Sequence, residues 1–241
     1  MHVKNVVIAK QQTGLVAEIF LPKGYPESVS EDYITYQCWD SAQALCSSVM
    51  GALSANAVFK GIGVGDEGAS ALSATTNWIL RQGLGKCASI TFAYRSGAAI
   101  GTDSKRYRLL ADIVNDCALT INLLSASVSP SIRPYIYACS SVCWAIVGIA
   151  GSCTRTALTI HQARANNAAD VQAKDQSQET LVELLGLAVS YFIVSMIGNH
   201  PAAVLALFAI FIALHLICNY NGKMITITPV LTELLLQLSS V

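Results

Sequence analysis

Long apolar stretches follow one another along most of this sequence. A helix that crosses the hydrocarbon core of a bilayer needs about 20 mostly apolar residues. Five stretches approach that length, at residues 41–59, 109–128, 135–158, 181–198 and 202–220, and two weaker ones lie at 69–80 and 87–100. Because backbone polar groups in lipid must be hydrogen-bonded internally, the pattern predicts an all-α membrane helix bundle with about 5–7 embedded helices and no central sheet.

The polar residues are concentrated in one block, residues 151–180, between two apolar stretches. Residues 184–222, which follow it, contain no Asp, Glu, Lys or Arg. Between His161 and Glu179 there is no glycine or proline and alanine recurs, which is unlike a loose loop and typical of closely packed helices. We therefore expect this segment to be an ordered polar element packed into the bundle, lining a cavity or a protein contact.

Changes in composition along the chain predict three parts. Residues 1–40 are expected to form an extended or interfacial segment, residues 41–221 the membrane helical domain, and residues 222–241 a C-terminal tail. In the first part, the short runs at 3–8 and 15–20 suit a small hairpin or extended chain. Tyr33, Tyr36 and Trp39 stand just before the first apolar stretch, where an interfacial aromatic belt is expected.

Overall composition agrees with an integral membrane protein and excludes some functions. The chain is 53% hydrophobic and 12% charged, with mean hydropathy +0.49 and a net charge of zero. Nothing in it indicates nucleic acid, which requires a basic patch. The eight cysteines lie mostly in apolar stretches and form no CxxC pair, so we interpret them as small buried hydrophobes and expect no metal or cofactor.

A glycine motif resembles a dinucleotide-binding turn. Gly63, Gly65 and Gly68 fit G-x-G-x-x-G, but such a site also needs a preceding strand and an acidic residue about 20 residues later, and the region around Lys86 offers none before Asp103. We interpret these glycines as a helix end with close backbone packing. Since the sequence also lacks a nucleophile elbow and a Walker lysine, we expect no enzyme.

Small residues at four-residue spacing predict close helix contacts. Gly51 with Ala55, and Gly148 with Ser152, have the spacing that lets membrane helices approach one another.

The sequence also contains weakly similar segments about a hundred residues apart. Residues 50–58 resemble 150–158, and residues 74–85 resemble 177–188. These similarities raise the hypothesis of an internal duplication. In it, the polar patches that follow residues 50–58 and 150–158 would meet at the interface of the two repeats.

Charged residues near the bilayer have two interpretations. Asp112, Asn115 and Asp116 share one helix face with Asn122, and Arg108 can pair with Asp112. They are either the hydrated first turns of a helix or an inward-facing polar cluster.

Arg155 follows an apolar stretch and needs a partner, because an arginine facing lipid is costly. We expect a carboxylate on a neighbouring helix, Asp112 or Asp116, or else Asp170 or Asp175 from the following segment. His200 and His215 stand on apolar ground and are interpreted as packed side chains.

Three long stretches, residues 21–65, 105–116 and 151–187, carry a family resemblance. Over residues 15–220 the chain resembles the root UV-B sensitive (RUS) family, also called DUF647. The resemblance implies a multi-pass membrane protein of organelles, linked in plants to UV-B responses, auxin and vitamin B6 homeostasis, without an established biochemical activity. Compared with the family, we expect this chain to be the membrane core only, without the long N-terminal extension and soluble C-terminal portion.

Two non-catalytic functions remain. The first is a carrier or small-molecule binder; the second is a structural subunit of a larger organellar membrane complex that docks membrane protein partners. A mitochondrion or plastid fits the resemblance better than the endoplasmic reticulum. The candidate residues for the polar cavity or docking surface are Asp112, Asn115, Asp116, Arg155, His161, Gln162, Arg164, Asn166, Asn167, Asp170, Lys174 and Asp175.

Overall fold

The computed structural model describes residues 14–62, 71–198 and 200–239, and these residues are mostly helical. The elements are α1 (Leu15–Phe20), α2 (Tyr33–Gly61), α3 (Ala71–Thr102), α4 (Ser104–Leu124), the 3-10 helix η1 (Ser125–Ser127), α5 (Arg133–Gln162), α6 (Ala168–Ile197) and α7 (Pro201–Ser239). Within the described part, the only β-type pairing is an isolated bridge between Val29 and Ala163. The predicted all-α fold is confirmed.

Within the described part of the chain, five helices are long and apolar enough to cross a membrane: α2, α4 with η1, α5, α6, and α7 up to Gly222. They correspond to the five stronger apolar stretches. From Ala71 onward, the two weaker stretches belong to the single helix α3, which continues through Arg81 and Lys86 between them. Polar residues interrupt the hydropathy there without interrupting the helix, because helical hydrogen bonds are made by the backbone. The motif glycines Gly63, Gly65 and Gly68 lie outside the described residues.

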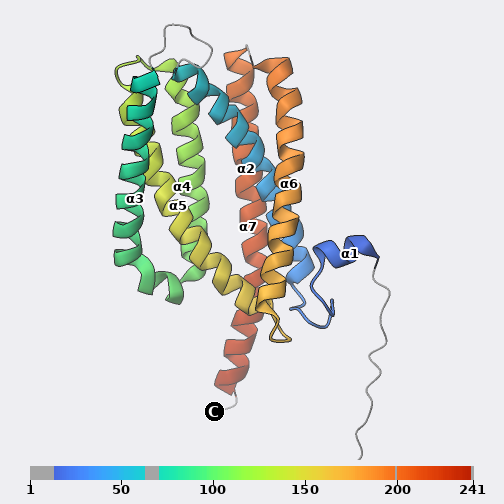
Figure 1. Ribbon diagram of the computed structural model, residues 1–241. Coiled ribbons are helices and arrows are strands. Elements are labelled where there is room, and N and C mark those ends of the chain that lie inside the picture. Colours follow the sequence, from blue (N-terminus) through green and yellow to red (C-terminus); the bar gives the residue numbers. More distant parts are fainter. Residues whose placement is uncertain (1–13, 63–70, 199, 240–241) are drawn as a thin grey trace, which may run out of the picture.

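The helices from α2 to α7 run alternately up and down the bundle (Figure 1). Three helices, α2 to α4, precede α5, and three is an odd number. α5 therefore starts at the end of the bundle opposite to the start of α2, and α2–α4 and α5–α7 are two halves of opposite orientation. Two contacts of the first half have counterparts in the second: α3 packs on α5 as α6 packs on α2, and α4 packs on α5 as α7 packs on α2. The contact of α2 with α4 has no such counterpart between α5 and α7 among the described residues. The two matched pairs of contacts have the form that an inverted duplication would give.

An apolar core closes the upper half of the bundle, where α2, α4 and α7 meet. Its buried side chains are Val49, Met50, Leu53, Ala57, Leu119, Leu123 and Phe208, and α6 covers them with Ile193 and Val194. Between membrane helices such contacts stabilise mainly through van der Waals packing, since lipid is as apolar as the core.

Helices α2 and α6 approach each other closely at Gly186, which is not one of the predicted small-residue pairs. A Cβ at Gly186 of α6 would overlap the Ser48 side chain of α2, whereas a Cβ at Gly51 or Gly148 would meet nothing within 4 Å. The prediction for Gly51 and Gly148 was wrong because residue spacing does not tell which face of a helix meets a neighbour.

Two expectations for the first part of the chain were also wrong. Residues 15–20 form helix α1 instead of a strand, while residues 3–8 lie outside the described part. Tyr33 and Tyr36 are 0% and 8% exposed, so they belong to the protein interior and not to an interfacial belt. Tyr33 packs against Val29 and Val171, because the segment before α2 folds over the start of α6.

Candidate functional site

Arg108 on α4 is the centre of the polar interior. Its Nη2 lies 2.8 Å from Oδ1 of Asp40 on α2, and its Nε lies 3.7 Å from Oδ2 of Asp112 one turn further along α4. The hydroxyl of Tyr36 also donates to Asp40, at 3.1 Å. The predicted pair of Arg108 with Asp112 is confirmed, and Asp40 is an additional partner on another helix.

Polar contacts between α2 and α4 recur at seven-residue intervals on α2. Asp40 meets Arg108, Ser47 accepts from Asn115 at 3.3 Å, and Ser54 donates to the carbonyl oxygen of Leu119 at 3.1 Å. The two helices run in the same direction (Figure 1), and seven residues are about two helical turns, so the polar positions share one face. Hydrogen bonds of this kind hold membrane helices in register.

A second set of polar contacts joins α4 to α7. Nδ1 of His215 lies 3.0 Å from Oδ2 of Asp116, and Asn219 donates to Asp112. Each pair is four residues from the next, which fits two antiparallel helices in contact along one face. The interpretation of His215 as a packed side chain on apolar ground therefore needs correction: it is packed, 1% exposed, but bonded to a carboxylate.

A cavity of about 230 Å³ lies between α2, α4, α5 and α7. Lys105 and Arg108 bring cationic groups to it, His161 brings an imidazole, and Asp40 brings a carboxylate. Lys105 and His161 are only half-buried, so the cavity is open to the exterior. The lining residues are Tyr36, Asp40, Gln43, Ser104, Lys105, Arg108, Thr154, Ala157, Leu158, His161, Asn219 and Gly222.

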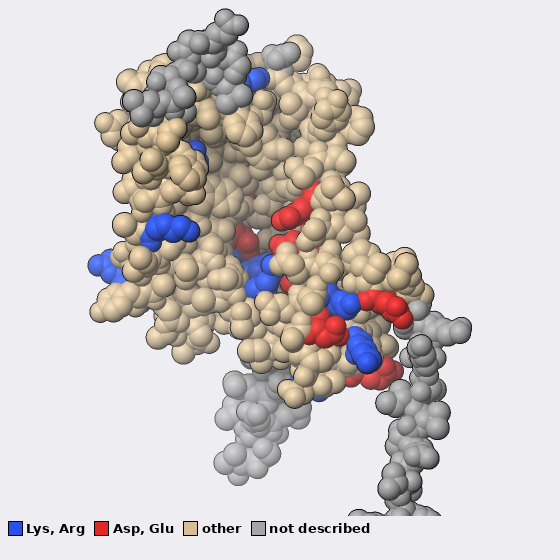
Figure 2. All heavy atoms as spheres, in the orientation of Figure 1, with Lys and Arg blue, Asp and Glu red and all other residues tan. Residues whose placement is uncertain are grey.

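Arg155 forms its ion pairs with α6, which agrees with the second predicted alternative, a carboxylate from the segment that follows Arg155. Its Nε lies 3.1 Å from Oδ2 of Asp175 and its Nη2 lies 2.7 Å from Oε2 of Glu179. Asp175 also accepts from Gln37 of α2, at 3.1 Å. Figure 2 shows acidic and basic side chains meeting in the hollow between the α5 and α6 sides of the bundle. The preferred partners, Asp112 and Asp116, were wrong because they face α2 and α7.

The polar block at 161–179 binds the segment that precedes α2. Asp170 accepts from the backbone N–H of Lys23 at 2.7 Å, Gln178 donates to the carbonyl of Phe20 at 2.6 Å, and Lys174 donates to the carbonyl of Glu18.

The other candidate residues of the block lie in or beside the loop between α5 and α6. Gln162 is buried and accepts from the backbone of Ser30, Arg164 donates from its backbone to Ser28, Asn166 has a positive φ of 54°, and Asn167 is the N-cap residue of α6.

The predicted candidates therefore separate into three groups. Asp112, Asn115 and Asp116 belong to the interior between α4 and its neighbours. Arg155 and Asp175 form the α5–α6 ion pair. Most of the others hold the N-terminal segment. Among the predicted candidates, the residue that lines the cavity is His161. Its Nε2 lies 3.3 Å from Oδ2 of Asp32.

Sequence reasoning missed several residues of the site. Asp40 falls in the segment that was predicted to be extended or interfacial, and Lys105, just before an apolar stretch, was given no role. His215 and Asn219 are four residues apart in a stretch without charges, and this i, i+4 spacing was the signal that could have identified a polar face on α7. Across the described residues, no group of three or more His, Cys, Asp or Glu side chains is arranged to hold a metal ion.

The fold and the site define a polytopic α-helical membrane protein with a charged interior open at one end. Residues 9–232 match the family model described as the vitamin B6 photo-protection and homoeostasis domain. The chain belongs to this family, the root UVB sensitive (RUS) family.

Curated relatives agree. The chain is 42% identical over 210 residues to RUS family member 1 of Dictyostelium discoideum, covering 86% of this chain and 40% of that protein. It is 34% identical over 207 residues to protein root UVB sensitive 3 of Arabidopsis thaliana, covering 86% and 47%. The chain thus spans less than half the length of these relatives. No solved structure matches it.

Proposed function

We propose that the protein is a membrane carrier or binder for a small polar metabolite that carries an anionic group. The observation that carries the proposal is the cavity between α2, α4, α5 and α7. Lys105 and Arg108 supply cationic donors there and His161 an imidazole, while Tyr36 and Leu158 supply apolar surface. A few polar groups on an otherwise apolar wall are typical of sites that orient a small ligand.

The size of the cavity favours a metabolite over a larger ligand. At about 230 Å³ it is smaller than the roughly 300–1,000 Å³ of pockets for drug-sized molecules. An arginine already held by two carboxylates offers its remaining donors in a fixed orientation, which suits phosphate or carboxylate.

A carrier, more than a static binder, is supported by the asymmetry between the two ends of the bundle. The cavity lies toward the end where α4 begins and α5 ends. At the other end, Arg133 donates to the carbonyl of Gly61 at 2.9 Å and Lys60 donates to the carbonyl of Gly198 at 3.1 Å, above the apolar core. Inverted repeats around a site open to one side are the usual construction of alternating-access carriers.

The family description suggests the first ligands to test. Because the matching domain is described as one of vitamin B6 homoeostasis, phosphorylated B6 vitamers are the leading candidates. Pyridoxine 5′-phosphate is the suitable probe, since it carries an aromatic ring and a phosphate but lacks the aldehyde that reacts with lysines.

Binding by the purified full chain in nanodiscs tests the proposal. Ala157→Phe fills the cavity, and Ala98→Phe on the exposed face of α3 is the matched control. We expect saturable binding of the probe, weakened at least about tenfold, or about 1.4 kcal/mol, by Ala157→Phe and unchanged by Ala98→Phe. Equal binding by both variants would place any ligand elsewhere.

The alternative is an accessory subunit of a larger organellar membrane complex. It is supported by large apolar side chains on the outer surface of α6, such as Tyr191, Phe192 and Met196, which are 70%, 65% and 80% exposed and suit either lipid or a protein partner. Purification in mild detergent decides: a chain that runs alone favours the carrier, and a stoichiometric large assembly favours the subunit. An organellar location is part of either proposal, since one relative is named chloroplastic.

A further inference from the structure

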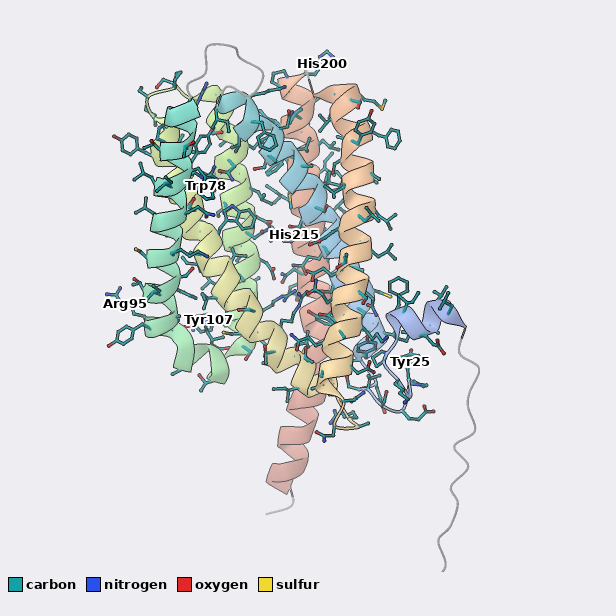
Figure 3. All side chains as sticks on the ribbon, in the orientation of Figure 1. Tyr25, Trp78, Arg95, Tyr107, His200 and His215 are labelled. Atoms are coloured by element: carbon teal, nitrogen blue, oxygen red, sulfur yellow. The ribbon has the colours of Figure 1, made fainter. Side chains whose placement is uncertain are left out.

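Asp116 and His215 form an ionisable pair inside the membrane-spanning part of the bundle. The side chains are 9% and 1% exposed, and the two residues belong to the candidate spans of α4 and α7. Figure 3 shows His215 in the interior of the bundle, between α4 and α7. Ionisable groups at membrane depth are costly and mark ion or proton pathways.

The pair lies where the two halves of the fold meet. α4 and α7 are the third helices of the two halves, and Asp116 and His215 are near-equivalent positions, roughly three to four turns from the start of each helix. A contact between equivalent positions of two inverted repeats falls on the pseudo-two-fold axis. That axis is where carriers of this construction place substrate and coupling-ion sites.

Around this pair, a proton is the positive charge that remains available to neutralise the Asp116 carboxylate. Across the described residues, no lysine or arginine pairs with Asp116, because Arg108 is held by Asp40 and Asp112. The other titratable groups nearby are thiols: Cys46 of α2, which lies within electrostatic reach of Asp116, and Cys218 of α7. Of the acidic residues of α6, Asp175 is bound by Arg155, and Glu183 is exposed.

An imidazole and a carboxylate at 3.0 Å can hold one proton between them as an overall neutral pair. Loss of that proton would leave a single negative charge in a dry interior, which is strongly unfavourable.

The pair is connected to the cavity through one further turn of α7. Asn219, four residues after His215, lines the cavity and donates to Asp112. Asn219 is 4% exposed, yet its Oδ1 has no hydrogen-bond partner among the described residues. A donor group on a bound ligand can satisfy this oxygen, so cavity occupation and the position of α7 at His215 are physically linked.

We propose that Asp116 and His215 form a proton-binding site and that its occupation is coupled to ligand in the cavity, which makes the protein a proton-coupled carrier. The coupling rests on the proposed carrier function, whereas the proton site does not. The proton comes from water in the open cavity and returns to water, so no other reactant is consumed.

Nitrogen-15 NMR of histidine-labelled full-length protein in nanodiscs tests the proton site directly. His215→Gln identifies the His215 resonance, and His161→Gln, which removes the half-exposed pair with Asp32, is the matched control. We expect the chemical shift of the His215 resonance to change with pH as the pair gains or loses its proton. Asp116→Asn should displace that titration, Asp116→Glu should retain it if the asparagine variant does not fold, and His161→Gln should leave it unchanged. A His215 resonance that stays constant over the whole pH range in which the protein remains folded would overturn the proposal.

Uptake of pyridoxine 5′-phosphate into proteoliposomes tests the coupling. We expect several-fold greater accumulation when the exterior is more acidic than the interior. Uptake that is equal with and without the gradient overturns the coupling and leaves the carrier function standing. A wild-type protein that takes up no probe while His215 still titrates contradicts the carrier function and keeps the proton site.

Discussion

Arg155 on α5 and Asp175 on α6 are joined by an ion pair of 3.1 Å between Nε and Oδ2, and Glu179 adds a second carboxylate one turn further along α6. Within the described residues, the direct contacts between α5 and α6 are few compared with those of α5 with α3 and α4. The pair therefore carries much of the attachment between these two helices.

Removing Arg155 should destabilise the bundle. Arg155→Ala leaves two carboxylates without their cation, and breaking a buried pair costs about 3 to 5 kcal/mol. Because the Arg155 side chain is 23% exposed, we expect a cost at the lower end, about 3 kcal/mol. The thermal unfolding midpoint in detergent measures it, with Arg95→Ala on the exposed face of α3 as the control (Figure 3). An unchanged midpoint for Arg155→Ala would show that the pair is not structural.

Gly186 should tolerate no side chain, in contrast to Gly51. Gly186→Ala forces α6 away from Ser48 of α2, and we expect a loss of about 1 to 3 kcal/mol, as for other overpacked contacts. Gly51→Ala adds a methyl group in open space in a helix interior, so it should be neutral or stabilise by up to about 1 kcal/mol. Paired thermal unfolding curves decide, and equal effects of the two substitutions would contradict the packing of α2 on α6.

Arg133 should not be replaceable by lysine. Its guanidinium donates to the carbonyl oxygens of Gly61, Ser125 and Val128, at 2.9, 3.2 and 3.1 Å, and so ties the end of α2 to the start of α5. A lysine ammonium lacks the planar fork that reaches all three. We expect Arg133→Lys to lose at least about 1.5 kcal/mol, the lower bound for a charged hydrogen bond. Chemical denaturation in detergent is the measurement, and a lysine variant as stable as the wild type would refute the geometry.

Hydropathy predicted where the spanning helices lie, but not which helices pack against one another. Each strong apolar stretch became a spanning helix, because lipid leaves the backbone no other way to satisfy its hydrogen bonds. Tyr36 shows the limit: an aromatic residue before an apolar stretch has the same pattern whether lipid headgroups or another helix cover it. The structure buries Tyr36 beside Asp40.

The polar partners could be predicted only where they share a helix. Arg108 with Asp112 follows from i, i+4 spacing. Asp116 with His215 joins residues 99 positions apart and depends on how α4 crosses α7, which no local pattern contains.

The polar block should be protected from hydrogen exchange. Residues 168–179 form the first turns of α6, and their side chains bind backbone groups of Phe20 and Lys23. We expect protection of this segment comparable to that of the rest of α6, measured by mass spectrometry in nanodiscs. Exchange at the rate of an open loop would show that this segment is a solvated connection and not a packed element.

Transport of a candidate ligand by the full chain tests the central claim most directly. Radiolabelled pyridoxine 5′-phosphate should enter proteoliposomes that contain the wild-type protein or Ala98→Phe faster than protein-free liposomes, with saturation at high concentration. Ala157→Phe, which fills the cavity, should reduce the initial rate at least about tenfold, as expected for the loss of roughly 1.4 kcal/mol of binding. Saturable uptake that is equally fast with Ala157→Phe would contradict the assignment of this cavity as the transport site.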